Sequence, residues 1–103
     1  MLIVLAEVTV EAGAAEQVRD ALQTMETETL KEPGCQTYAF SVDVTNPTMI
    51  RITEKWDDMA ALEAHFNTPH MAAFGGAIAQ IKPKGMDVKV YEVAGEVALP
   101  GRG

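Results

Sequence analysis

Apolar and polar positions recur with different periods along the chain, and each change of period marks an element. Residues 2–10 (LIVLAEVTV) are rich in β-branched apolar side chains over a length too short for a helix of that composition, which predicts a strand. Over residues 14–30, apolar or small side chains recur at spacings of four, three and four between Val18 and Thr29. This spacing predicts an amphipathic helix, and the KEPG of 31–34 predicts the turn that ends it.

Two segments with period-two alternation follow. Residues 35–44 and 48–56 predict antiparallel strands, joined by a turn at the Thr-Asn-Pro of 45–47. One face of the second strand carries Ile50, Ile52, Glu54 and Trp56.

Two helical segments and a strand complete the pattern. A short helix is predicted over 57–68, with Asp57 or Asp58 as its N-cap. Its inward-facing side chains are expected to be Met59, Leu62 and Phe66. A second helical piece begins at Pro69 and runs to residue 82, and the final strand is predicted over 86–99.

The order β-α-β-β-α-β predicts a ferredoxin-like α+β fold, an antiparallel sheet with helices on one face. We expect one domain over residues 1–99 and a flexible tail over 100–103. The strands carry large apolar side chains on both faces, and one layer of helices covers only one of them. A second copy of the sheet is the simplest cover for the other face, so we expect a homodimer.

Charge and composition narrow the partners. The 103-residue chain has a formal net charge of -7 and no basic stretch, which argues against nucleic acid and anionic membrane. MLIVLA lacks the basic residues of a signal peptide, and no run approaches the ~18 apolar residues of a membrane span, so we expect a cytoplasmic protein. The single cysteine, Cys35, excludes an internal disulfide and is interpreted as a small buried apolar side chain.

Both histidines and the single tryptophan lie within residues 54–74. His65 falls at the border of the apolar stripe of its helix, so its imidazole points into a cleft or is half-exposed and hydrogen-bonded to a carboxylate. His70 follows Pro69 and either caps the preceding turn or flanks a pocket mouth. The proline interrupts the helix between the two histidines, so we do not expect them to bind a metal as a pair.

Glu54 and Trp56, on the same face of their strand, are the other candidate site residues. A carboxylate on an apolar strand face either lies at a solvated rim or is buried, and a buried one has a raised pKa and can act as a base. Trp56 ends its strand where the helix begins, so its indole either forms a wall between sheet and helix or fills the core. The chain has no phosphate loop, no dinucleotide fingerprint and no Ser-His-Asp motif.

Three runs of this sequence resemble the antibiotic biosynthesis monooxygenase family, which includes cofactor-independent quinol and anthrone oxygenases. They are EPGCQTYAF, NPTMIRITEKWDDMAALEAH and TPHMAAF. The most specific part runs from Glu54 through Trp56, Leu62 and His65 to His70. The resemblance implies a dimeric α+β barrel with a pocket between the sheet and the helices of each subunit. It does not extend to the haem-degrading relatives, whose asparagine and histidine are absent from LAEVTV and AAFGGA.

The resemblance implies a monooxygenase that oxidises a small aromatic hydroquinone or anthrone with O2 and uses no cofactor and no metal. The expected catalytic residues are His65, Trp56 and Glu54. The expected substrate-binding residues are Tyr38, Phe40, Ile52, Phe66, His70 and Phe74. Two alternatives stay open: a non-catalytic protein that binds a small molecule, and an isomerase of a phosphorylated signalling sugar, for which Arg51 and Lys55 are the nearby cations.

Overall fold

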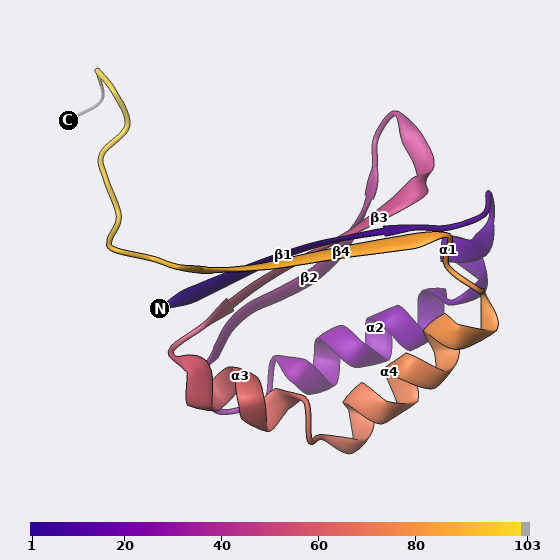
Figure 1. Cartoon of the computed structure of the whole chain (residues 1–103), viewed down its shortest axis with the longest axis horizontal. Helices are drawn as coiled ribbons and strands as arrows, with labels where there is room; N and C mark the ends of the chain where they lie inside the picture. Colours follow the sequence, from indigo (N-terminus) through magenta and orange to yellow (C-terminus); the bar gives the residue numbers. More distant parts are fainter. Residues whose placement is uncertain (102–103) are drawn as a thin grey trace.

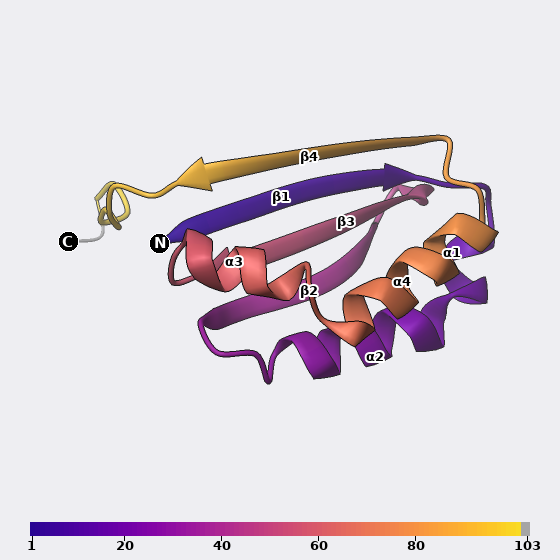
Figure 2. The same cartoon turned by 60° about the horizontal axis from the view of Figure 1, so that its bottom comes forward.

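The structure, a computed structural model, describes residues 1–101 and consists of one four-stranded sheet and four helices. The elements are β1 (Leu2–Thr9), α1 (Ala14–Gln17), α2 (Arg19–Thr29), β2 (Cys35–Asp43), β3 (Asn46–Trp56), α3 (Met59–His65), α4 (Pro69–Gln80) and β4 (Gly85–Glu92). All helices lie on one side of the sheet in Figure 1, and Figure 2 shows α2 and α4 side by side beneath it. The antiparallel strand order β2-β3-β1-β4 confirms the predicted ferredoxin-like α+β class.

The register of the sheet places one row of four side chains under the helices. Tyr38 of β2 pairs with Glu54 of β3, Glu54 with Val4 of β1, and Val4 with Val90 of β4. Because successive side chains of a strand point to opposite faces, these four share the helix-facing side. The predicted face of β3 is correct, since Ile50, Ile52, Glu54 and Trp56 are all buried.

The first helical segment is divided in two. Val18, with φ −106° and ψ 12°, leaves the helical conformation and separates α1 from α2. The break lets α1 contact β3 while α2 contacts β2, and both Ala14 and Val18 remain in the core. The single helix expected over 14–30 is therefore wrong at this position, which the apolar spacing alone does not mark.

The third helix is shorter than expected and directs fewer side chains inward. The Asp58 side chain accepts a hydrogen bond from Ala61 N and begins α3, which ends at His65. Leu62 and His65, three residues apart, are buried, whereas Met59 and Phe66 are 49% and 60% exposed. Met59 and Phe66 are therefore not buried as expected, because two helical turns present only one row of side chains fully to the sheet. Within residues 1–101, no helix has the length and apolarity needed to cross a bilayer.

The hairpin turn lies earlier than the Asn-Pro sequence indicates. Val44 and Thr45 form the turn, and the Asp43 carboxylate accepts hydrogen bonds from Thr45 N and Oγ1. Asn46 and Pro47 already belong to β3. The side-chain hydrogen bonds of Asp43 therefore determine the position of the turn.

The final strand ends at Glu92 and not at residue 99. Val93 N donates the last hydrogen bond, to Met1 O, and residues 94–99 continue past β1 with no strand of the described chain beside them. The strand expected over 93–99 is therefore wrong, since alternating apolar residues form a strand only where a partner is present. Residues 102–103 of the expected tail lie outside the described residues.

Candidate active site

A cavity of about 400 Å³ lies between the sheet and helices α3 and α4. Apolar side chains from β1, β3, β4 and both helices form most of its wall, and three polar side chains reach it: Tyr38, Glu54 and His65. Its size falls within the range of sites that enclose a small organic molecule. The register explains the grouping, because Tyr38 and Glu54 are cross-strand neighbours and His65 ends the helix packed over them.

Tyr38 supplies a neutral hydroxyl to this cavity. Burial is the largest cause that raises the pKa of its phenol, and the nearby carboxylate of Glu54 raises it further. Its ring centroid lies 5.5 Å from that of His65 and 5.4 Å from that of Phe40. The phenol therefore stays protonated at neutral pH and can donate a hydrogen bond to a bound oxygen.

Glu54 is a buried carboxyl with one donor. The side chain is on the apolar face of β3, the residue is 7% exposed, and Trp56 Nε1 donates to its Oε1 at 2.9 Å. Burial raises the pKa of the Glu54 carboxyl, and the Trp56 hydrogen bond opposes the shift. The solvated-rim interpretation of Glu54 is wrong; the group is a buried acid or base at the cavity wall.

His65 is 1% exposed, so the half-exposed surface interpretation is also wrong. Its ring lies 4.9 Å from the indole of Trp56, and Nδ1 lies 2.7 Å from Oε2 of Glu32. Glu32 is in the turn that follows α2, where Gly34 has φ 84°. A Cβ at Gly34 would lie 2.6 Å from Ala61 Cβ, so glycine is what allows the turn to pack directly against α3.

The second histidine reaches the same carboxylate from α4. His70 Nε2 lies 2.6 Å from Glu32 Oε2, the oxygen that also contacts His65. The N-cap Thr68, whose hydroxyl oxygen accepts a hydrogen bond from Met71 N, fixes the start of α4 and hence the position of His70. Glu32, missed by the sequence interpretation, thus joins two helices at one oxygen. The only signal was its place in the EPGCQTYAF run and the expectation that His65 has a carboxylate partner.

Glu32, His65 and His70 have the composition of a metal site, and their donor atoms lie within 4.8 Å of one another. Two ligands of a tetrahedral zinc ion with bonds of about 2.0–2.1 Å are separated by roughly 3.3 Å. The observed N–O separations of 2.6 and 2.7 Å are hydrogen-bond lengths instead. The cluster is an imidazole–carboxylate–imidazole arrangement.

This fold and cavity agree with what sequence comparison finds. The family profile of antibiotic biosynthesis monooxygenase matches residues 1–77. The chain belongs to the antibiotic biosynthesis monooxygenase family. A curated relative, the probable quinol monooxygenase YgiN of Escherichia coli, is 36% identical over 88 residues, covering 76% of this chain and 85% of that protein. An uncharacterized protein of Synechocystis is 29% identical over 93 residues, which are 90% of this chain and only 63% of that protein's length.

Solved structures share the family fold. A Deinococcus radiodurans structure described under the same family name superposes with a TM-score of 0.88 at 26% identity, covering 98% of this chain and 100% of that chain. A Pseudomonas aeruginosa protein superposes with a TM-score of 0.79 at 28% identity, covering 90% of this chain and 94% of that chain. Both likenesses extend beyond residue 77, and that to the Deinococcus structure includes the last strand.

Within this family fold, the cavity contains some of the predicted site residues and not others. Those that line it are His65, Glu54, Tyr38, Ile52, Phe66 and Phe74. Trp56 does not, because it is fully buried at the end of β3, next to the His65 ring. His70 lies instead on a shallow depression between α2 and α4, beside Asp20 and Thr24.

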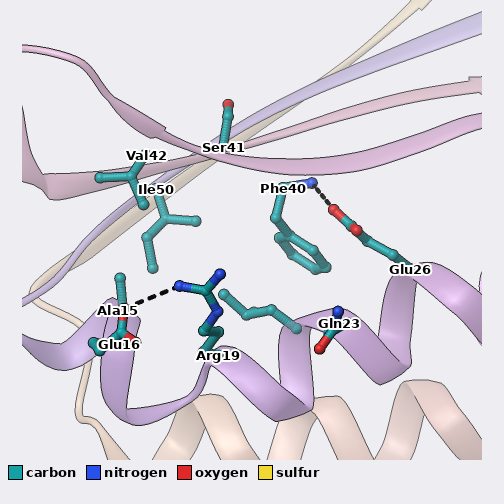
Figure 3. A pocket seen from close by; sticks show the side chains of 10 residues that line it. Ala15, Glu16, Arg19, Gln23, Glu26, Phe40, Ser41, Val42 and Ile50 are labelled. Atoms are coloured by element: carbon teal, nitrogen blue, oxygen red, sulfur yellow. Dashed lines mark hydrogen bonds and ion pairs between the residues drawn. The ribbon is translucent and has the colours of Figure 1, made fainter.

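Phe40 also lies outside this cavity. Its ring packs against that of Phe74 at 5.4 Å and faces a second depression, between α2 and β2, shown in Figure 3. There Glu26 Oε2 accepts a hydrogen bond from Phe40 N at 2.6 Å, and Arg19 pairs with Glu16. Charged side chains line this depression, so it suits an aromatic ligand less than the apolar cavity over the sheet does.

Proposed function

We propose that the protein is a cofactor-independent monooxygenase that oxidises a small aromatic hydroquinone or anthrone with O2. The observation that carries this proposal is the apolar cavity whose polar groups are Tyr38, Glu54 and His65. A flat aromatic ring suits such walls, and the few polar groups can orient its hydroxyl or carbonyl oxygen. The similarity to a relative described as a probable quinol monooxygenase adds support.

His65 is the base in this proposal. Its Nδ1 is held by Glu32, which leaves Nε2 to take the proton of a phenolic hydroxyl or of an anthrone methylene. The substrate anion can then pass electrons to O2. One oxygen atom becomes bonded to a substrate carbon, the other leaves as water, and the substrate supplies all of the electrons. Apolar walls that exclude water help to keep the anion on this route.

Oxygen uptake tests the proposal. Purified protein with a naphthohydroquinone or anthrone, a chelator and no added cofactor should consume O2 above the rate of the protein-free reaction. His65→Ala should lower turnover by roughly 10²–10⁴-fold, the usual contribution of a general base. Glu63→Gln, an exposed change on the same helix, should leave it unaltered. Full uptake by His65→Ala would remove His65 from the mechanism, with Glu54 the next candidate base.

The same assay separates the alternatives. Ligand-induced stabilisation without O2 uptake would identify a binding protein. A sugar-phosphate isomerase needs a cation for the phosphate, yet no Lys or Arg of residues 1–101 lines the cavity. Arg51 points to the other face of the sheet, where it pairs with Glu7 and Asp43. The isomerase alternative therefore has no observation in its favour.

The functional unit that we propose is a homodimer. The sheet face that no helix covers carries Leu5 and Tyr91, each about half exposed. Face-to-face packing of two sheets would bury both. Light scattering at micromolar concentration should give twice the chain mass of 11.1 kDa, and a stable species of one chain mass would contradict the dimer. The cytoplasmic location stays a prediction.

A further inference from the structure

We propose that Glu32 is a positioning residue: it holds His65 in the tautomer whose Nε2 lone pair faces the cavity, and His70 holds Glu32. Its kinetic consequence rests on the proposed function, whereas its structural consequence can be measured without a substrate. The proposal stands on the two hydrogen bonds that converge on Glu32 Oε2.

The chemistry of the partner assigns the proton on His65. An ionised carboxylate only accepts hydrogen bonds, so an imidazole nitrogen 2.7 Å from Glu32 Oε2 must carry the hydrogen. In a neutral imidazole the other nitrogen is then unprotonated. Within residues 1–101, the His65 ring makes no other hydrogen bond, and the ring lines the cavity while Glu32 does not. The lone pair of Nε2 is therefore the one available to a substrate.

His70 supplies a second hydrogen bond that holds the Glu32 carboxylate in place beside His65. The Glu32 side chain is only 10% exposed, and a carboxylate at such a depth is stabilised by each donor that reaches it. His70 Nε2, at 2.6 Å, is the second donor, and its side chain is 16% exposed at the outer depression. The exposed fraction of the side chain increases from His65 (2%) through Glu32 (10%) to His70 (16%). His70, which supports Glu32, therefore lies on the side away from the substrate.

The backbone of the turn that carries Glu32 packs directly against the start of α3. The turn of Glu32 is pinned by the Gly34–Ala61 approach and by the hydrogen bond from Asp57 N to Gly34 O at 2.8 Å. These contacts join the turn to the start of α3, the helix that ends at His65. The base and its partner therefore move as one unit, which is what an oriented base requires.

Nitrogen-15 spectra of the imidazole rings test the tautomer directly. In the unliganded protein at neutral pH, His65 should show a protonated Nδ1 and an unprotonated Nε2. Glu32→Ala should convert this signal to a mixture of tautomers, while Glu28→Ala should leave it unaltered. Glu28 is the matched control, because this carboxylate in the last turn of α2 is four residues from Glu32 and pairs with Lys31 at the surface.

Steady-state kinetics provide the second readout, measured with the substrate that gives the fastest oxygen uptake in the assay proposed for the function. Because Glu32 does not reach the cavity, Glu32→Ala should lower kcat by roughly 10²–10³-fold, a large part of the 10²–10⁴-fold contribution of the base that it orients, and should leave KM within about threefold. Glu32→Gln retains an oxygen acceptor and the shape, so it should keep the Nδ1–H tautomer and lose much less turnover, about tenfold.

The outcomes separate the two proposals. If Glu32→Ala fails to fold, Glu32→Gln and His70→Gln decide, since both must retain the Nδ1–H tautomer of His65 if Glu32 sets it. An unaltered tautomer in Glu32→Ala, or a wild-type ring with its proton on Nε2, overturns the positioning role. A tautomer that depends on Glu32 in a protein that consumes no O2 would support the positioning role and contradict the monooxygenase.

Discussion

Replacing Trp56 with phenylalanine removes the donor that the structure gives to the buried carboxyl of Glu54. The Trp56 Nε1–Glu54 Oε1 distance is 2.9 Å, and the two residues are 0% and 7% exposed. A hydrogen bond to a charged group contributes about 1.5–3 kcal/mol, and the smaller ring adds roughly 1 kcal/mol of lost packing. Where Glu54 is ionised, Trp56→Phe should therefore lower the free energy of unfolding by about 2.5–4 kcal/mol.

The effect should depend on pH in a definite direction. Burial raises the pKa of Glu54 above its ordinary value of 4.5, so the folded state binds this proton more tightly than the unfolded state. The contribution of Glu54 to stability is thus fully present below about pH 4.5 and is lost as pH rises through the folded-state pKa. The Trp56 donor opposes this loss. Trp56→Phe should be more costly at about pH 8 than at about pH 4, because the ionised form of Glu54 gains more from the donor and is more populated at the higher pH.

Urea unfolding followed by far-ultraviolet circular dichroism measures the change, since the variant has no tryptophan fluorescence. Protein concentration must be held constant, because a dimer's stability depends on it. A double-mutant cycle with Glu54→Leu, which removes the acceptor, isolates the bond from the packing, and we expect a coupling energy of about 1–2 kcal/mol. A coupling below about 0.3 kcal/mol, or an equal loss at both pH values, would refute the reasoning.

Three further outcomes follow from single positions. Gly34→Ala should destabilise the fold by roughly 2–4 kcal/mol in urea unfolding, because its φ of 84° disfavours a side chain and the new Cβ would lie 2.6 Å from Ala61 Cβ. Thr29→Val should raise the free energy of unfolding by about 1 kcal/mol, since the Thr29 hydroxyl is buried with no partner in residues 1–101; a loss instead would indicate a partner for it. Burial, chiefly, raises the pKa of the Cys35 thiol to about 11, so alkylation at neutral pH should be at least tenfold slower than for a small free thiol, and equal rates would contradict this.

The strands and their faces could be predicted from the sequence because alternation is a local property. Ile52, Glu54 and Trp56 lie on one face wherever the strand is placed. The burial of His65 could not be predicted, because helical spacing placed it at the border of an apolar stripe that was assumed to include Phe66. The actual stripe is set by where α3 ends and how the helix packs on the sheet.

The role of Glu32 as a partner of both histidines could not be predicted from local sequence patterns. It is 33 residues from His65 and 38 from His70, and no spacing rule relates them. Their contact depends on the close approach of Gly34 to Ala61 and on the place where Thr68 begins α4. Such a meeting of three segments is a property of the packed molecule. The break at Val18 and the end of β4 at Glu92 are likewise decided by neighbours far along the chain.

The position of β1 in the sheet has a consequence for biosynthesis. β1 leaves the ribosome before the two strands between which it lies, β3 and β4, and Leu2 pairs with both Trp56 and Glu92. The β2–β3 hairpin is local and can form early, but pairings between strands far apart in the sequence are slow to form. Because Met86, Val88 and Val90 line the cavity from β4, a nascent chain exposes its unfinished apolar wall until translation has passed Glu92.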